Sequence, residues 1–194
     1  MKRLAAFAAF ALVSLFAAAA AATPITYVAD LTGAAESPPS GSPGTGFAIV
    51  IIDPIAHTME VKVTFAGLLG TTTASHKHSC TAAPGTGLAG VATVTPTFTG
   101  FPLGVTSGTY DHTFDLMDAG SWNSPFITAH GGTPAGAEAA LLAGLAAGEA
   151  YLNIHSTYRP GGEIRGFLAV PEPGSLALLG VALAGIAFVR RKMG

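Results

Sequence analysis

Two histidines separated by a single residue, His76 and His78, are the clearest candidates for chemistry in this sequence. Side chains two residues apart in a β-strand lie on the same face, so both imidazoles would point the same way. A third histidine, His155, lies in a later strand-like segment beside Tyr151 and Asn153. If the two segments pair, three imidazole nitrogens form a ligand set that zinc and copper both favour. The alternative is that these histidines only hydrogen-bond to loops and strand ends.

A second polar group lies near the end of the body of the chain. Glu163 and Arg165 are two residues apart and are expected to share a face of the last predicted strand. We expect them to pair with each other or with Glu36 as a structural salt bridge. The sequence contains no nucleophile-elbow, phosphate-loop or dinucleotide-binding motif, and no pair of acidic residues stands out as a hydrolase site. It therefore favours a protein that is not an enzyme.

The segments that carry these residues are strand-like. Between residues 59 and 65 apolar and polar residues alternate, which is the period of a half-buried strand. The apolar run before it, 47–52, ends at Asp53-Pro54, so a hairpin is expected across residues 53–58. Further candidate strands cover residues 25–31, 74–79, 91–95, 109–117, 149–157 and 164–169. Many short strands separated by Gly and Pro predict an all-β sandwich or barrel.

One segment, residues 134–147, has the composition of a helix instead. It is rich in Ala and Leu, with Thr133 placed as the N-cap and Pro134 as the first helical residue. Gly148 follows as the C-terminal stop. We therefore expect one short helix inserted before the penultimate strand.

Both ends of the chain differ from the body. A basic start, an uncharged apolar stretch and an alanine-rich end predict a secretory signal peptide over residues 1–22. At the other end an apolar run, 174–189, predicts a transmembrane helix. Three basic residues follow that run and favour the cytoplasmic side of a membrane: Arg190, Arg191 and Lys192.

The body between these ends, residues 23–169, has the size of one domain. Five of the nine Lys and Arg residues lie in the ends, which leaves four basic residues against ten acidic ones and a net charge of about −6. Without a basic stripe, the domain is not expected to bind nucleic acid. Cys80 has no internal disulfide partner because it is the only cysteine, so the fold must rest on its apolar core.

The C-terminal segment resembles a PEP-CTERM sorting signal. The triplet Pro171, Glu172 and Pro173 is followed by the apolar run and the basic tip at the extreme C-terminus. The resemblance implies a bacterial protein that a membrane transpeptidase of the exosortase type recognises and cleaves. It also implies transient anchoring by the C-terminal helix and delivery to the outer envelope or to extracellular polysaccharide.

The body resembles a CHRD (chordin-type) domain. The match covers roughly residues 27–168, with motifs in the family order, and departs from the family at Ser79-Cys80. These motifs are LTGAAESPP at 31–39, SHKH at 75–78, YLNIH at 151–155 and PGGEIRG at 160–166. The resemblance implies a secreted β domain without a settled biochemical activity.

A weaker similarity connects the histidines with copper/zinc superoxide dismutases. That similarity implies copper-type ligands at His76, His78 and His155, and an anion-guiding role for Arg165. The sequence lacks the dense His/Asp loop and the cysteine pair of those enzymes.

The sequence thus predicts an antiparallel, Greek-key-like β-sandwich, similar to superoxide dismutases or immunoglobulins, with one short helix. Three segments are expected: a signal peptide at 1–22, a CHRD domain at 23–169 and a sorting signal at 170–194. We expect a structural or binding role at the cell envelope or its matrix. The alternative is a metalloprotein with copper or zinc, including a superoxide-dismutase-like redox enzyme.

Overall fold

The computed structural model describes residues 23–172, so the predicted signal peptide, membrane helix and basic tip lie outside the described residues. Within residues 23–172 no helix is both long and apolar enough to cross a membrane. The elements in chain order are β1 (Ile25–Thr32), β2 (Thr45–Asp53), β3 (Thr58–Ala66), β4 (Thr72–His78), β5 (Gly108–Asp115), η1 (Ala119–Ser121), α1 (Ser124–Ala129), α2 (Pro134–Ala146), β6 (Tyr151–Ser156) and β7 (Ile164–Phe167).

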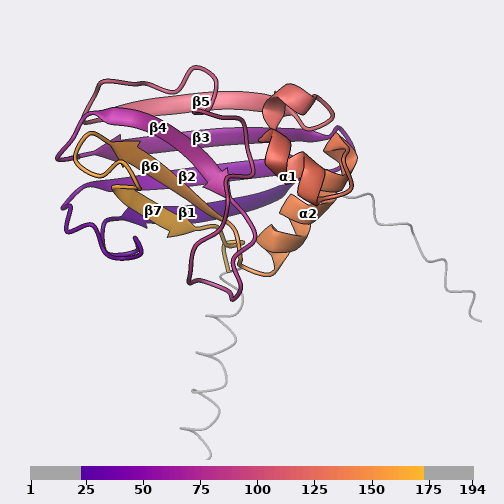
Figure 1. Ribbon diagram of the computed structural model, residues 1–194, viewed down its shortest axis with the longest axis horizontal. Coiled ribbons are helices and arrows are strands. Elements are labelled where there is room, and N and C mark those ends of the chain that lie inside the picture. The colour runs from indigo at the N-terminus through magenta and orange to yellow at the C-terminus, as the bar shows by residue number, and fades with distance from the viewer. Residues whose placement is uncertain (1–22, 173–194) are drawn as a thin grey trace, which may run out of the picture.

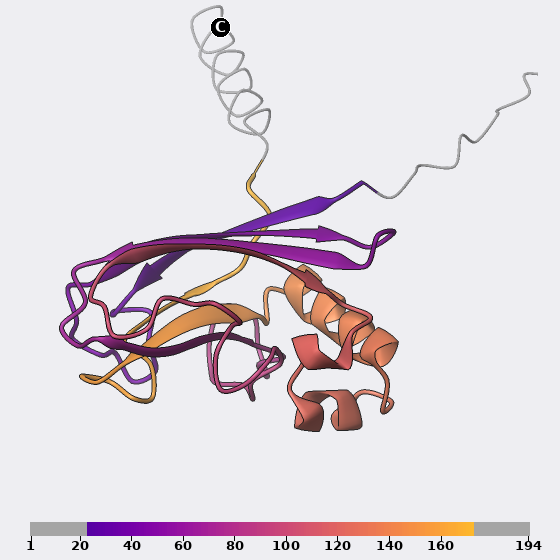
Figure 2. The ribbon, with the colours of Figure 1, turned by 90° about the horizontal axis from the view of Figure 1, so that it is seen from above.

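The strands form one curled antiparallel sheet in the order β4-β6-β7-β1-β2-β3-β5. The sheet folds over at the junction of β7 and β1, where one pair of residues, Thr32 and Arg165, is in register. Two layers result, with β1, β2, β3 and β5 in one and β4, β6 and β7 in the other (Figures 1 and 2). The chain crosses between the layers after β3, β4 and β5, so the predicted Greek-key-like, antiparallel β architecture is confirmed.

Alternation of side chains builds the core between the layers. In β3 the apolar residues at 59, 61, 63 and 65 are buried while the polar residues between them are not. β2 pairs with β3 along their whole length, from Thr45 opposite Ala66 to Asp53 opposite Thr58, which confirms the predicted hairpin. Its turn is closed by Asp53, whose carboxylate accepts hydrogen bonds from the amides of Ile55 and Ala56.

The predicted helix is confirmed as α2, which lies with α1 at one end of the sandwich (Figure 2). The Thr133 hydroxyl accepts a hydrogen bond from the Gly136 amide, and Gly148 has a positive φ of 71° just after the helix. These are the expected N-cap and C-terminal stop. Helix α1 was not predicted, because six residues are too few to show a helical period.

Residues 91–95 do not form the predicted strand. Val91 and Thr93 make only isolated bridges, to His78 and Trp122 respectively. The segment is followed at once by Pro96, which has no amide hydrogen to continue a ladder. It belongs to a long loop between β4 and β5 that runs along the free edge of β4, where the amides of Ala92 and Phe98 donate to the carbonyls of Lys77 and Ser75.

Glu163 joins the loops at the opposite end of the sandwich from the helices. Its carboxylate accepts hydrogen bonds from the Ser42 hydroxyl at 2.6 Å, from the amides of Leu69 at 2.6 Å and Gly70 at 3.2 Å, and from the Ser156 hydroxyl. Burial alone would raise its pKa, but these four hydrogen bonds outweigh burial and lower the pKa below its usual value.

Glu163 does not share a face with Arg165, contrary to expectation. Of the two expected pairings, the one present is that of Arg165 with Glu36, and Glu163 does not take part in it. Strand β7 begins only at Ile164, after Gly162 with a φ of 131°, so the strand's alternation does not extend back to Glu163.

We predict that Glu163→Gln lowers the free energy of unfolding at pH 7 by about 1–3 kcal/mol, because an amide cannot accept all four hydrogen bonds. Since the folded pKa of Glu163 is lowered, its stabilisation is present above the unfolded value near 4.5 and is lost as the pH falls below it. Urea denaturation should therefore show wild type and variant converging toward pH 3. Glu60→Gln, on the outer face of β3, serves as the control; a constant gap at all pH values would contradict the prediction.

Candidate metal centre

The three histidines singled out by the sequence come together on the outer face of the β4-β6-β7 layer. His76 and His78 alternate with Lys77 along β4, and His155 lies on the neighbouring strand β6. The register places Asn153 opposite His76 and Tyr151 opposite His78. One potential ligand nitrogen from each imidazole lies within 4.8 Å of the other two, and Nδ1 of His76 is 3.2 Å from Nε2 of His155.

The outward-facing nitrogen of each ring is bound to a backbone carbonyl. Nε2 of His76 lies 2.8 Å from the Pro96 oxygen, Nδ1 of His78 lies 2.8 Å from the Ala89 oxygen, and Nδ1 of His155 lies 2.8 Å from the Pro160 oxygen. A carbonyl oxygen only accepts hydrogen bonds, so each of these nitrogens must carry the proton and donate it.

In the neutral rings the three inward-facing nitrogens are consequently lone-pair acceptors. Nε2 of His78 is buried and has no hydrogen-bond partner. Nδ1 of His76 and Nε2 of His155 face each other as two acceptors at 3.2 Å. Ligands of tetrahedral zinc, at about 2.0–2.1 Å from the metal, lie about 3.3 Å apart, so this pair already has ligand spacing. The arrangement suits a cation that shares three lone pairs.

Burial keeps the three imidazoles neutral. It lowers the pKa of His76 to about 4, with the neighbouring rings of His155 and His78 adding to the effect. Burial also lowers the pKa of His78 and of His155. Histidine binds metal only as the neutral imidazole, so protons compete weakly at neutral pH.

Lys77 lies between the two β4 histidines in sequence but on the opposite face. Its side chain is fully buried in the core, with Nζ beside the sulfur of Met59, and burial holds its pKa well below the usual value. The alternation of β4 thus keeps this amine away from the imidazoles.

Arg165 and Glu36 form a buried pair beside the cluster. Nε of Arg165 lies 3.8 Å from a Glu36 oxygen, and both side chains are at most 5 % exposed. The guanidinium also donates to the carbonyls of Ala35 and Gly87 and stacks over Tyr151, whose ring in turn stacks on His78. Burial raises the pKa of Glu36 to about 7 although Arg165 opposes it. Arg165 is thus bound to protein groups on several sides.

The other histidines and the cysteine lie elsewhere. His57 bonds to Glu138 on α2, His112 is on β5, and His130 ends α1. Cys80 is exposed just after β4. Among the described residues, only His76, His78 and His155 form a group of three or more potential metal-ligating side chains.

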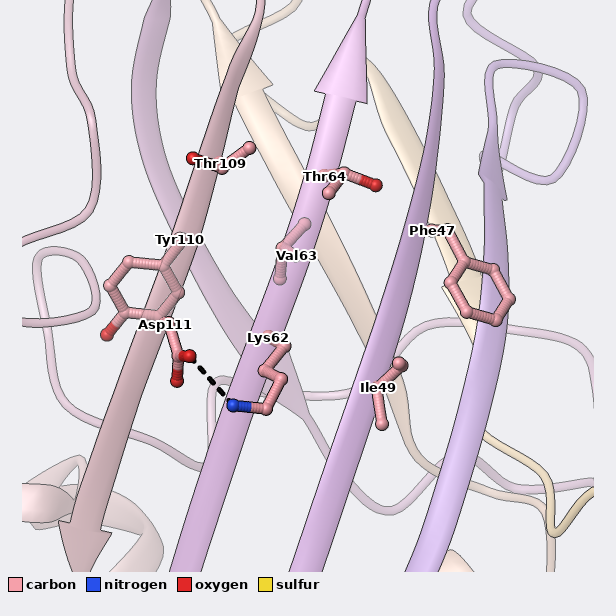
Figure 3. A pocket seen from close by; sticks show the side chains of 8 residues that line it. All are labelled: Phe47, Ile49, Lys62, Val63, Thr64, Thr109, Tyr110 and Asp111. Carbon is pink, nitrogen blue, oxygen red and sulfur yellow. Dashed lines mark hydrogen bonds and ion pairs between the residues drawn. The ribbon is translucent and has the colours of Figure 1, made fainter.

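A separate hollow of about 360 Å³ lies on the outer face of β2, β3 and β5 (Figure 3). It includes Phe47, Ile49 and Lys62, whose ammonium donates to Asp111 at 2.7 Å. The hollow's opposite charges are therefore already paired with each other.

Sequence patterns could not identify the groups that complete the cluster. The carbonyls of Ala89, Pro96 and Pro160 belong to the backbone, and no residue type marks them. Glu36 lies in a loop that precedes His155 by 119 residues, so no local pattern predicts that it lies beside the cluster. In the sequence, only the family order of the motifs that contain Glu36 and the histidines indicated that these residues belong together.

Fold and cluster together define a β-sandwich domain whose outer face carries a loop-covered histidine cluster. The chain belongs to the CHRD domain family, whose family model matches residues 27–168. A second match, to the PEP-CTERM protein-sorting motif, covers residues 169–192. No curated protein and no solved structure matches the chain.

We predict that stability falls as the pH rises from about 4.5 to about 7 through the contribution of Glu36. The folded state holds a proton on this carboxyl over that range while the unfolded state does not, a contribution on the order of 1–3 kcal/mol. Glu36→Gln mimics the protonated carboxyl, so its free energy of unfolding should rise relative to that of the wild type as the pH increases across this range. Urea denaturation at pH 4.5 and 7.5 measures the difference; parallel profiles for the two proteins would count against it.

Proposed function

We propose that this exported domain binds a divalent transition-metal cation, zinc or copper, through Nδ1 of His76 and Nε2 of His78 and His155. The observation that carries the proposal is that all three outward nitrogens donate to carbonyls, which turns three lone pairs toward one another. Metal-ligating histidines characteristically donate their second ring N–H to such a group, which fixes the tautomer and the ring orientation.

The chemistry of the ligand set supports zinc or copper. Imidazole nitrogen suits both ions, whereas magnesium and calcium prefer oxygen ligands. The three rings are neutral, so the ion would keep its full charge inside a domain of net charge about −6. The ion's electrostatic attraction to the acidic domain would then add to the three metal–nitrogen bonds.

The sorting motif supports a location for such binding outside the cytoplasm. The PEP-CTERM match marks the protein as an exported bacterial protein processed by an exosortase-type enzyme. The last backbone contacts of the domain are the two hydrogen bonds between Ala169 and Val28, and Val170, Pro171 and Glu172 are exposed and irregular after them. An exposed extended segment is accessible to a processing enzyme. We place the binding role at the outer envelope or in extracellular polysaccharide.

A redox activity stays a prediction from sequence similarity alone. An anion guide must reach solvent, whereas Arg165 is 3 % exposed and bonded to Glu36, Ala35 and Gly87. These contacts support a structural role for this residue, and the proposal is therefore one of binding.

We predict that the protein, expressed from its full-length gene and purified in mild detergent, binds one zinc or copper ion per chain. His76→Ala and His155→Ala should each weaken binding by more than about a hundredfold, because losing a direct ligand exceeds the ten- to hundredfold effect of outer groups. Calorimetric titration gives the affinity, and metal analysis of protein from the native envelope identifies the ion.

His112→Ala is the matched control, since it removes an imidazole from β5 outside the cluster. It should leave affinity and stoichiometry unchanged. Wild-type protein that takes up neither ion, or histidine variants that bind as tightly as wild type, would rule the proposal out.

We predict that the protein recovered from envelope or culture medium ends near Glu172-Pro173. Exosortase-type processing would remove the apolar run and the basic residues Arg190 to Lys192. Intact-mass spectrometry determines the C-terminus. A chain with Pro171, Glu172 and Pro173 replaced by alanine should keep its tail, whereas an intact tail on the wild-type protein would indicate a permanent anchor instead.

A further inference from the structure

Three buried side-chain atoms around the cluster lack a hydrogen-bond partner: Nε2 of His78, Oδ1 of Asn153 and Oε1 of Glu36. Burying a polar atom without a partner is costly, so such atoms mark places where a ligand completes the site. The one at His78 is already assigned to the proposed metal. The other two lie on the neighbouring side chains Asn153 and Glu36.

Asn153 is placed on the same face as the three histidines. It alternates with Tyr151 and His155 along β6 and lies opposite His76 on β4. Its side chain is 2 % exposed and lies beside the His78 ring, where it acts on that ring's pKa. The two side chains are close enough for Asn153 to act on the His78 ring as a hydrogen-bonding group, yet neither Oδ1 of Asn153 nor Nε2 of His78 has a partner at full hydrogen-bond geometry, as expected of two acceptors.

The orientation of the Asn153 amide follows from what lies on its other side. A methyl group added at Gly162 would come within 2.8 Å of Nδ2 of Asn153 and within 2.6 Å of Oε1 of Glu36. The amide nitrogen and the carboxylate therefore both face the backbone of Gly162. It is the amide nitrogen, not the oxygen, that lies on this side, so the oxygen end of the Asn153 amide turns away from Gly162 toward His78.

We propose that Oδ1 of Asn153 is the fourth ligand of the metal centre and that Glu36 orients the amide. This inference rests on the proposed function and extends its ligand set from three nitrogens to three nitrogens and one oxygen. A four-coordinate set of this kind matches the coordination number that zinc prefers in closed sites. Gly162 is then required because any side chain would enter the space between Glu36 and Asn153.

In the alternative arrangement the amide is flipped and has a structural role only, with Nδ2 donating a hydrogen bond to Nε2 of His78. The oxygen would then face Glu36 across Gly162, which brings two acceptors together unless that carboxyl carries a proton. Replacing Asn153 with alanine separates the two arrangements, since it removes a ligand oxygen in the first but only an N–H that occupies Nε2 of His78 in the second.

The test uses the full-length protein in mild detergent at pH 8, with zinc for affinity and cobalt(II) as the spectroscopic probe. Asn153→Ala should weaken zinc binding by at least about tenfold, but less than the loss of a histidine, because a neutral amide oxygen is a weaker ligand for zinc than an imidazole nitrogen. It should also change the visible cobalt bands, which report the number and kind of ligands. Asn153→Asp should bind zinc at least as tightly as wild type, with shifted cobalt bands, because a charged oxygen takes the same position.

Asn123→Ala is the matched control, because the Asn123 amide donates to the Val91 carbonyl outside the ligand set. Thermal denaturation in a chelator shows whether each variant folds without metal. Unchanged zinc affinity in Asn153→Ala, or an equal loss in Asn153→Ala and Asn153→Asp, would overturn the fourth-ligand assignment while leaving the three-histidine site intact. Wild-type protein that binds neither zinc nor copper would overturn both the three-histidine site and the fourth-ligand assignment. This result is obtained before any variant is made.

Discussion

A backbone carbonyl oxygen can accept a hydrogen bond but cannot donate one, and three such oxygens determine the chemistry of the histidine cluster. They come from the long loop between β4 and β5 and from the turn between β6 and β7. Because each oxygen takes the N–H of one ring, the remaining nitrogens face inward as acceptors. The loops are thus part of the site, and the strands alone would leave the tautomers of His76, His78 and His155 undefined.

Strand β6 connects the cluster with the rest of its layer, because it lies between β4 and β7. One face of β6 packs Leu152 and Ile154 into the core, while the other carries Asn153 and His155. Shifting its register by one residue would exchange these two sets. Core packing and ligand placement therefore depend on the same pairing, so the apolar core also fixes the site's geometry.

Sequence patterns predicted the parts that depend on local periodicity. Alternation in β3, the hairpin at Asp53 and the caps of α2 are local signals, and all three are confirmed. The two-residue spacing of His76 and His78 likewise placed them on one face. The failures at residues 91–95 and at Glu163 involve contacts between distant loops, which override local preference and leave no periodic trace.

Charge is distributed so that a cation can be accommodated beside neutral ligands. Lys77 is held on the core side of β4, and Arg165 is balanced by Glu36 and separated from His78 by the ring of Tyr151. Had either basic group faced the imidazoles directly, its charge would oppose a bound metal at short range, where a partly buried site screens it weakly. Glu36 instead lies beyond Asn153, and above its pKa of about 7 its negative charge would favour the ion without displacing a ligand. Metal binding in this arrangement is therefore expected to depend on the placement of these charges as well as on the three rings.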